Sequence, residues 1–224
     1  IAVRDGKPAD GALRADLARL AEEHDLARLT WGDDETLERR PPHITFGPAR
    51  VMPPPGAFLQ ATPQGEAALR DGVIEAVGGA KRVADLFSGC GTFSLPLSDR
   101  AEVHAVEASR AMLAALDGGW RHAGGLRKVT TEARDLFRSP VIAEDLGAFG
   151  AVVIDPPRAG AEAQVAEIAQ ARVPRVAHVS CNPVTFARDC ATLVRAGYRL
   201  DWLRVVDQFR WSTHIEVVAQ LTLP

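Results

Sequence analysis

From residue 81 onward, short apolar runs alternate with segments that have the periodicity of helices. The apolar runs lie at residues 82–87, 102–106, 128–132, 151–154, 175–180, 200–207 and 214–221. Helices fit between most of the first six runs, and this alternation predicts an α/β fold: a doubly wound, mostly parallel, seven-stranded sheet with helices on both faces. Only a short connection joins the last two runs, so we expect the last strand to enter antiparallel.

The amino-terminal part of the chain follows a different pattern. Leucines recur at roughly helical spacing over residues 11–29, which predicts a helix. Short strand-like pieces follow at residues 35–38, 43–46 and 49–52. We interpret this stretch as a fragment of an α+β domain without an evident core of its own.

A proline-rich segment separates this fragment from the rest. The run Val51-Met-Pro-Pro-Pro-Gly56 indicates a boundary. Thr62 can then cap an amphipathic helix that begins at Pro63 and extends to about residue 77. We therefore expect a partial α+β domain at residues 1–53 and an α/β domain at residues 54–224.

Composition bounds the class of protein. Of the 224 residues, 46% are hydrophobic, yet no apolar run approaches the roughly 18 residues that a membrane span needs. Three cysteines (Cys90, Cys181 and Cys190) are too few and too scattered for a disulfide framework or a four-thiolate cluster. We expect a cytoplasmic protein with reduced thiols, no bound metal and no membrane contact.

Charge gives an ambiguous indication about nucleic acids. The net charge of −3 argues weakly against such a partner, because nucleic-acid-binding domains are usually basic. Between residues 171 and 211, however, seven arginines stand against three aspartates, an excess of +4 that flanks Cys181 along the chain. A basic binding surface and an ordinary solvated helix face explain this excess equally well.

The first candidate for chemistry is Cys181, in Val179-Ser-Cys-Asn-Pro183. An apolar strand leads into the motif, and Asn182-Pro183 is typical of a helix start. The thiol would lie between the end of a strand and the positive end of a helix, a location that lowers a thiol pKa and favours the nucleophilic thiolate. The alternative is that Cys181 is a small buried hydrophobe, as most free cysteines are.

A glycine-rich loop follows the first predicted strand of the α/β domain. In Asp85-Leu-Phe-Ser-Gly-Cys-Gly91, the two glycines would let the backbone approach a ligand closely. Glu107 ends the next strand, where a carboxylate can bind both hydroxyls of a ribose. A nicotinamide-dinucleotide site has the same outline, but Ser94 replaces its third glycine and Asp85 would repel a pyrophosphate. The cationic S-adenosylmethionine fits this loop better, and a simple tight turn is the remaining alternative.

Two further motifs come from later strands. In Asp155-Pro-Pro-Arg158, a strand delivers the carboxylate to the sheet edge and two prolines stiffen the backbone after it. Arg158 would suit a phosphate or a polarised carbonyl. Glu216 lies within an otherwise apolar strand, and His214 shares its face by the period-two rule. A carboxylate in such a strand is usually paired or functional, unless it faces solvent from an edge strand.

Together these motifs resemble the RNA 5-methyluridine methyltransferases. The resemblance rests on Asp85-Leu-Phe-Ser-Gly-Cys-Gly, Asp155-Pro-Pro-Arg, Ser180-Cys-Asn-Pro with Thr185-x-Ala-Arg-Asp, His214-Ile-Glu, and Phe58-Leu-Gln60. It covers the chain from Pro54 to the end, and residues 1–53 as the central domain of that family. It implies a Rossmann-like domain that transfers a methyl group from S-adenosylmethionine to carbon-5 of a uracil in rRNA or tRNA.

The resemblance also implies roles for individual residues. Cys181 matches the nucleophile and Glu216 the general base. The cofactor pocket corresponds to Gln60, Phe87, Thr92, Glu107, Asp135 and Asp155. Arg158 and His214 would lie on the substrate side, and Arg158, Asp155 or Gln60 could hold the uracil carbonyl and imide edge. Thr92 stands where asparagine is common, and Arg210-Trp-Ser-Thr replaces the more usual Pro-His/Tyr-Thr.

The implied chemistry explains these residue types. A thiolate that adds to carbon-6 of uracil makes carbon-5 nucleophilic, and a base must later remove the carbon-5 proton. The target uridine must be unstacked, so an RNA loop is the expected substrate, with rRNA favoured over tRNA. A different methyltransferase, or an RNA-binding module without catalysis, remains an alternative. We expect a monomer.

Overall fold

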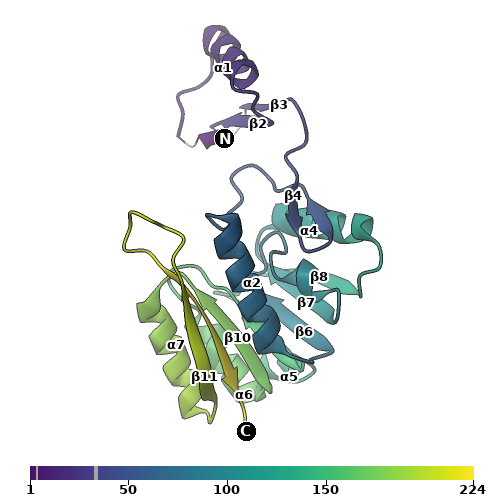
Figure 1. The fold of residues 1–224 in the computed structure, drawn as a ribbon, viewed down its shortest axis with the longest axis vertical. Helices are drawn as coiled ribbons and strands as arrows, with labels where there is room; N and C mark the ends of the chain where they lie inside the picture. The colour runs from purple at the N-terminus through teal and green to yellow at the C-terminus, as the bar shows by residue number, and fades with distance from the viewer. Residues whose placement is uncertain (4, 33–34) are drawn as a thin grey trace.

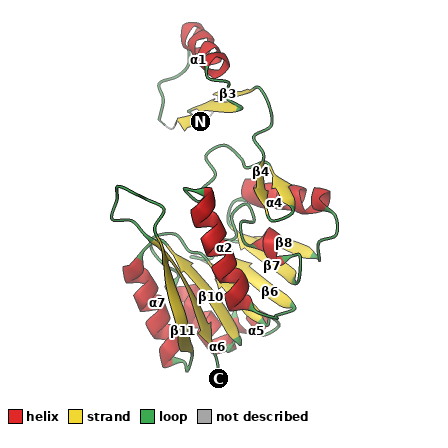
Figure 2. Cartoon of the chain, viewed as in Figure 1, coloured by secondary structure: helices red, strands yellow, loops and turns green. Residues whose placement is uncertain are grey.

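The computed structural model describes residues 1–3, 5–32 and 35–224, and its main body is a seven-stranded sheet between two layers of helices (Figure 1 and Figure 2). The strands are β6 (Arg82–Leu86), β7 (Glu102–Glu107), β8 (Val129–Ala133), β9 (Ala151–Ile154), β10 (Arg175–Ser180), β11 (Arg199–Val206) and β12 (Glu216–Thr222). Their order is β11-β12-β10-β9-β6-β7-β8. Neighbours from β10 to β8 are parallel, and β12 is antiparallel to both β10 and β11. The predicted fold class is confirmed.

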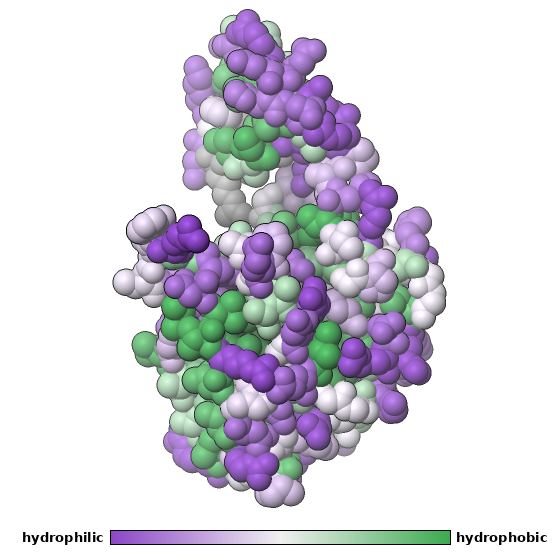
Figure 3. Space-filling view, viewed as in Figure 1, coloured by the Kyte–Doolittle hydropathy of each residue, from purple (hydrophilic) through white to green (hydrophobic). Residues whose placement is uncertain are grey.

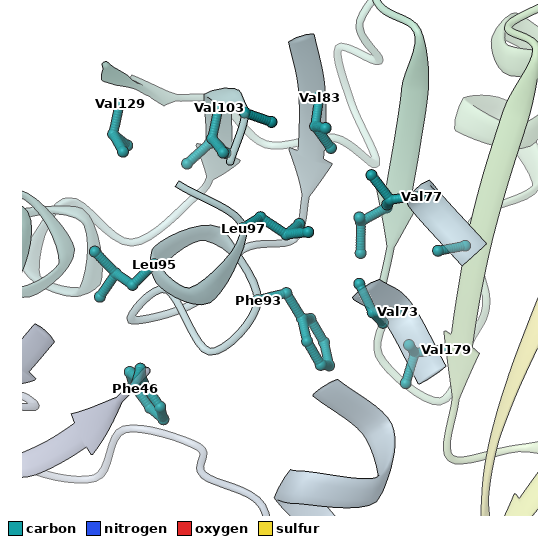
Figure 4. Close-up of a cluster of buried hydrophobic side chains, with 14 of the residues drawn as sticks. Phe46, Val73, Val77, Val83, Phe93, Leu95, Leu97, Val103, Val129 and Val179 are labelled. Carbon is teal, nitrogen blue, oxygen red and sulfur yellow. The ribbon is translucent and has the colours of Figure 1, made fainter. Parts of the chain in front are cut away.

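Each face of the sheet carries its own core. One face packs against α2 (Pro63–Val77), α3 (Ser94–Leu97) and α4 (Arg110–Ala123). The other packs against α5 (Ala143–Leu146), α6 (Glu162–Ala171) and α7 (Pro183–Arg195). Figure 4 shows the first core, in which Val73 and Val77 of α2 and Phe93 beside α3 lie near Val179 of β10. Helices on both faces leave the strand ends and the edge strand β11 as the accessible parts of the sheet.

The predicted helix starts are confirmed by their caps. The Thr62 side chain accepts a hydrogen bond from the backbone N–H of Gly65 at 3.0 Å, and Pro63 occupies the first turn of α2. At α7, the Asn182 side chain accepts a hydrogen bond from the Val184 N–H at 3.1 Å, and Pro183 follows the cap. Both caps satisfy backbone donors that have no partner within their own helix.

The amino-terminal unit departs from the sequence prediction in two ways. Helix α1 (Gly11–Glu23) ends before residue 29, because Asp25 adopts a positive φ of 47° and the chain then enters strand β2 (Arg28–Trp31). This strand pairs with β1 (Ala2–Val3) and β3 (Glu35–Glu38). The unit also has a small core of its own, formed by Leu17, Ala21 and Leu29. Figure 1 shows it standing apart from the main body.

A hairpin connects this unit to the main body. Its strands are β4 (Ile44–Phe46) and β5 (Ala49–Val51), and Phe46, Ala49 and Val51 are buried in the core beside α4. The hairpin precedes residue 53 and yet packs with the α/β body; the division of the chain into domains at residues 53 and 54 stays a prediction.

The surface of the described residues is mixed in character. Figure 3 shows mostly hydrophilic side chains over the amino-terminal unit, and hydrophobic side chains gathered over the edge strand β11, where Leu203 and Val205 are exposed. None of the helices in the described part of the chain has both the length and the apolar character needed to cross a membrane.

Candidate active site

The sheet topology brings the separate motifs to one edge. Strands β6, β9 and β10 are parallel neighbours, so the loops that follow them emerge side by side. Strand β12 runs the opposite way, and its register pairs Val217 with Ser180. Its first residue, Glu216, therefore lies beside Cys181, which follows Ser180.

One pocket of about 460 Å³ joins these loops. Its lining includes nine of the ten residues predicted for the site: Gln60, Phe87, Thr92, Glu107, Asp135, Asp155, Arg158, Cys181 and Glu216. The tenth, His214, lies on the neighbouring loop, where its Nδ1 is 3.2 Å from Nη1 of Arg158. The structure thus brings all ten residues together, while their roles stay proposals.

Glu107 holds two loops of the pocket together. Its carboxylate accepts hydrogen bonds from the N–H of Ser109 at 2.9 Å and from the N–H of Gly89 at 3.2 Å. Gly91 has a φ of +94°, and a Cβ there would lie 2.8 Å from the Leu116 side chain, so the tight loop needs glycine at this position. Phe87 lies in the pocket wall and also has a positive φ, 64°. Residues other than glycine rarely adopt this backbone conformation.

Asp135 and two aromatic rings form the far wall of the pocket. The Asp135 carboxylate accepts a hydrogen bond from the Phe137 N–H at 3.0 Å. The rings of Phe87 and Phe137 lie with their centroids 5.5 Å apart, and Phe58 is largely exposed at the pocket's edge. A flat, partly apolar ligand suits this wall.

Beneath the pocket, Asp85 is a fully buried carboxylate. Its Oδ2 accepts a hydrogen bond from the Ser94 hydroxyl at 2.5 Å, and its Oδ1 has no partner in the described structure. Burial raises the pKa of Asp85 to about 7. Ser94, noted in the sequence only as a missing glycine, is therefore the residue that holds this carboxylate.

Asp155 and Glu216 add two more carboxyl groups with raised pKa values. Burial raises the pKa of Asp155 to about 8, with further contributions from Glu216 and Asp85. Burial likewise raises the pKa of Glu216 to about 7, although a hydrogen bond from Gln208 opposes the shift. Among the described residues, no salt bridge neutralises any of the three. The pocket therefore suits a cationic ligand.

The expected lowering of the Cys181 thiol pKa is wrong for this structure. Burial raises that pKa, and the carboxylates of Glu216 and Asp155 raise it further, against smaller opposing effects of a backbone hydrogen bond and Arg158. Short-range sequence signals identified the helix start but not the carboxylates that β9 and β12 bring to the thiol. Either a cation in the pocket or proton transfer to a carboxylate would favour the thiolate.

Gln208 is a site residue that the sequence did not reveal. Its Nε2 donates to Oε1 of Gln60 at 2.6 Å, and its Oε1 accepts from the Thr62 N–H at 3.4 Å. These bonds tie the loop before β12 to the segment before α2. Nothing in the local sequence marks a glutamine for this task.

Most of the arginines between residues 171 and 211 do not lie near Cys181. Arg175 begins β10 and Arg199 begins β11, at the end of the sheet opposite Cys181, and Arg195 ends α7. Arg204 forms an ion pair with Glu75, and Arg199 with Asp201. The solvated-face interpretation therefore accounts for most of the excess.

Known proteins resemble this chain over most of its length. Residues 121–222 match the family model for tRNA (uracil-5-)-methyltransferase. An uncharacterized RNA methyltransferase of Brucella suis is 49% identical over 217 residues, which are 97% of this chain and 52% of that protein. A 23S rRNA (uracil(1939)-C(5))-methyltransferase of Chromohalobacter salexigens is 37% identical over 171 residues, which are 75% of this chain and 35% of that protein.

Solved structures agree on the fold. The tRNA (uracil-54, C5)-methyltransferase of Pyrococcus abyssi, solved with S-adenosyl-L-homocysteine, superposes with a TM-score of 0.78 at 22% identity. The match covers 98% of this chain and 54% of that one. The chain thus spans about half the length of the first of these relatives and of this solved structure.

Proposed function

We propose that the chain acts as a member of the RNA (uracil-5-)methyltransferase family and transfers a methyl group from S-adenosylmethionine to carbon-5 of a uridine in RNA. The observation that carries this proposal is one pocket of about 460 Å³, in which the Cys181 thiol lies beside the Glu216 carboxyl and which Glu107 also lines. A methyltransferase that acts on amino groups would have no use for this pair.

The residues of the pocket fit the proposed cofactor. S-Adenosylmethionine carries a sulfonium and an ammonium group, and Asp155 and Glu107 offer carboxyl groups that form no salt bridge with the described residues. Glu107 would accept hydrogen bonds from the ribose, and Phe87 and Phe137 would enclose the adenine. Oδ1 of Asp85, which has no hydrogen-bond partner in the described structure, lies beneath the loop, and Asp85 would add negative charge there when it is ionised. When bound, the cofactor supplies an electrophilic methyl group.

Cys181 would act first on the RNA base. Its thiolate adds to carbon-6 of uracil, and the electron pair of the carbon-5–carbon-6 bond becomes available at carbon-5 for bond formation to the methyl carbon. The thiol must lose its proton before it adds. A bound cationic ligand would ionise the neighbouring Asp155 carboxyl, whose pKa is raised to about 8 in the ligand-free protein, and that carboxylate would accept the thiol proton; Glu216 then keeps its carboxylate for the later step.

Glu216 would complete the reaction. After methylation, its carboxylate takes the carbon-5 proton, the double bond re-forms, and the Cys181 sulfur leaves carbon-6 with its electron pair. A pKa near 7 suits a base that must be partly ionised at neutral pH yet strong enough to take a proton. Arg158, at the pocket's edge, would donate to a uracil carbonyl.

The substrate is proposed to be rRNA rather than tRNA. The 37% identical relative is named for 23S rRNA, and this favours rRNA over the tRNA named for a structural neighbour of lower identity. In either RNA the uridine must leave the base stack to reach Cys181, so a loop is the expected target. We expect the protein to work as a cytoplasmic monomer.

A mechanism-based trap tests the proposed function. RNA that contains 5-fluorouridine carries fluorine in place of the carbon-5 proton, so a base cannot release the adduct. With S-adenosylmethionine, the protein should form a covalent complex that survives a denaturing gel and is absent in Cys181→Ala. If the wild-type protein binds the RNA but forms no covalent complex, the result contradicts the proposed function and supports an RNA-binding module without catalysis.

A further inference from the structure

Helix α7 begins immediately after Cys181 and runs beside the loop that carries Arg158. Side chains from the first half of this helix contact the main chain of residues 158–161, which follow Asp155-Pro-Pro. We call these side chains the α7 clamp; they are Asn182, Thr185, Arg188 and Asp189.

The clamp binds main-chain groups of the loop. The carbonyl oxygen of Arg158 accepts hydrogen bonds from Nδ2 of Asn182 at 2.9 Å and from Oγ1 of Thr185 at 3.2 Å. Nη2 of Arg188 donates to the carbonyl oxygen of Ala159 at 3.1 Å. Oδ2 of Asp189 accepts from the N–H of Ala161 at 2.9 Å. The helix and the loop are thus joined by four hydrogen bonds.

The loop also packs closely against the clamp. Gly160 has a φ of +74°, and a Cβ at this position would lie 2.4 Å from Nη2 of Arg188 and 2.7 Å from Oδ2 of Asp189. Asp189 is only 1% exposed, a costly place for a carboxylate. Its Oδ1 accepts from Arg188 at 2.8 Å, so both of its oxygens are used within the clamp. A buried, fully bonded polar cluster of this kind specifies one geometry.

The clamp connects the three loops that carry the proposed chemistry. Asn182 is adjacent to Cys181 in the chain, and the residue that it holds, Arg158, reaches His214 with its guanidinium group at 3.2 Å. His214 lies two residues before Glu216. A displacement of the loop would therefore move the Arg158 guanidinium relative to both Cys181 and Glu216.

We propose that Thr185 and Arg188 are positioning residues. They act through the main chain of residues 158–161 to hold the Arg158 guanidinium group in a fixed position relative to the Cys181 thiol. This inference rests on the proposed function, because it assigns Arg158 to the uracil. Displacements of about 1 Å in such groups cost on the order of a hundredfold in rate, so the loss of one clamp contact should be measurable.

Two matched pairs of variants on the same helix test the clamp. Thr185→Val removes the hydroxyl that reaches Arg158, and Thr192→Val removes one that reaches only a carbonyl of its own helix. Thr185 also approaches its own helix carbonyl at Asn182, so the difference between the two variants isolates the loop contact. Arg188→Gln removes the contact to Ala159 together with the bonds to Asp189. Arg195→Gln serves as its control because, among the described residues, the Arg195 side chain donates to the Ala191 carbonyl of its own helix and not to the loop.

Two readouts are measured for each variant. The first is the single-turnover rate of the covalent complex with 5-fluorouridine RNA. The second is the rate of trypsin cleavage after Arg158, identified by mass spectrometry, which follows local opening of the loop and requires no activity. The affinity for S-adenosylhomocysteine is measured alongside by calorimetry.

Thr185→Val and Arg188→Gln should each slow complex formation about tenfold or more and speed cleavage after Arg158 several fold. Cofactor affinity should change less than about twofold, Thr185→Ser should restore both rates, and both control variants should match the wild type. In an Arg158→Lys background, Thr185→Val should have a much smaller effect, because the group that the clamp positions has gone.

The proposal is overturned if Thr185→Val forms the complex at the wild-type rate, or if Thr192→Val slows it equally. Failure of the proposed function is a distinct result, since the wild type itself would then form no complex. In that case cleavage after Arg158 still decides: unchanged cleavage in both clamp variants overturns the clamp, and faster cleavage in both, but not in the controls, supports it.

Discussion

Cofactor binding should depend on pH through Asp155. This carboxyl has a pKa raised to about 8 by burial and by the neighbouring carboxylates of Glu216 and Asp85. Below that value it is protonated in the free protein, and a cationic ligand bound beside it must first displace the proton. The sign follows directly: affinity should rise with pH up to about 8 and then level off.

The magnitude is bounded by proton stoichiometry. If one proton leaves on binding, the dissociation constant falls by at most tenfold per pH unit, or about 1.4 kcal/mol. Between pH 6 and 8 this gives up to about a hundredfold, and less where water screens the half-buried side chain. Glu216, with a pKa raised to about 7, can add to the slope only below that pH.

Titration calorimetry with S-adenosylmethionine at several pH values, in buffers of different ionisation enthalpy, measures both the affinity and the number of protons released. Asp155→Asn is the control, because it keeps the shape of the side chain and cannot titrate; its affinity should be low and nearly independent of pH from 7 to 8. A wild-type dissociation constant that stays the same from pH 6 to 8, with no proton release, would refute the assignment of Asp155 to a cationic ligand.

Three further predictions follow from the same site. Cys181→Ala should abolish methyl transfer with cofactor affinity within a few fold; single-turnover transfer at the wild-type rate would exclude a nucleophilic role. Glu107→Ala should weaken S-adenosylmethionine binding through the loss of two ribose hydrogen bonds, each worth on the order of 1–3 kcal/mol. Unchanged cofactor affinity in calorimetry would show that the cofactor does not bind at Glu107. Asp85→Asn should stabilise the ligand-free protein by a few kcal/mol at pH 8 but not at pH 4. Burial raises the Asp85 pKa from 3.8 to about 7, so the free-energy cost of folding with this carboxyl grows between those two pH values and is complete above 7; equal denaturant midpoints at pH 8 would contradict this.

The α/β fold could be predicted because its signals are local. Apolar runs fix the strands, and the short connection after β11 fixes the direction of β12. The Thr62 and Asn182 caps follow from residue type alone. The leucine spacing of α1, by contrast, could not show that Asp25 would turn the chain into β2.

The electrostatics of the site could not be predicted in the same way. Helix-start signals suggested a lowered pKa for Cys181, whereas the carboxyls that raise it come from β9 and β12, which are distant in the chain. The arginines after residue 171 looked like one basic cluster, but α7 and the strands carry several of them away from the pocket. The bonds of Gln208 to Gln60, and of α7 to residues 158–161, likewise exist only in three dimensions.

The division of labour between Cys181 and Glu216 is tested most directly with Glu216→Gln and unmodified RNA. This change keeps the shape of the side chain and removes its basicity, so addition and methyl transfer should proceed while proton removal stalls. We predict a slow-migrating protein–RNA band on a denaturing gel, with the methyl group of S-adenosylmethionine already on the RNA, and no band when Cys181 is also replaced. Release of methylated RNA at the wild-type rate would show that Glu216 is not the base.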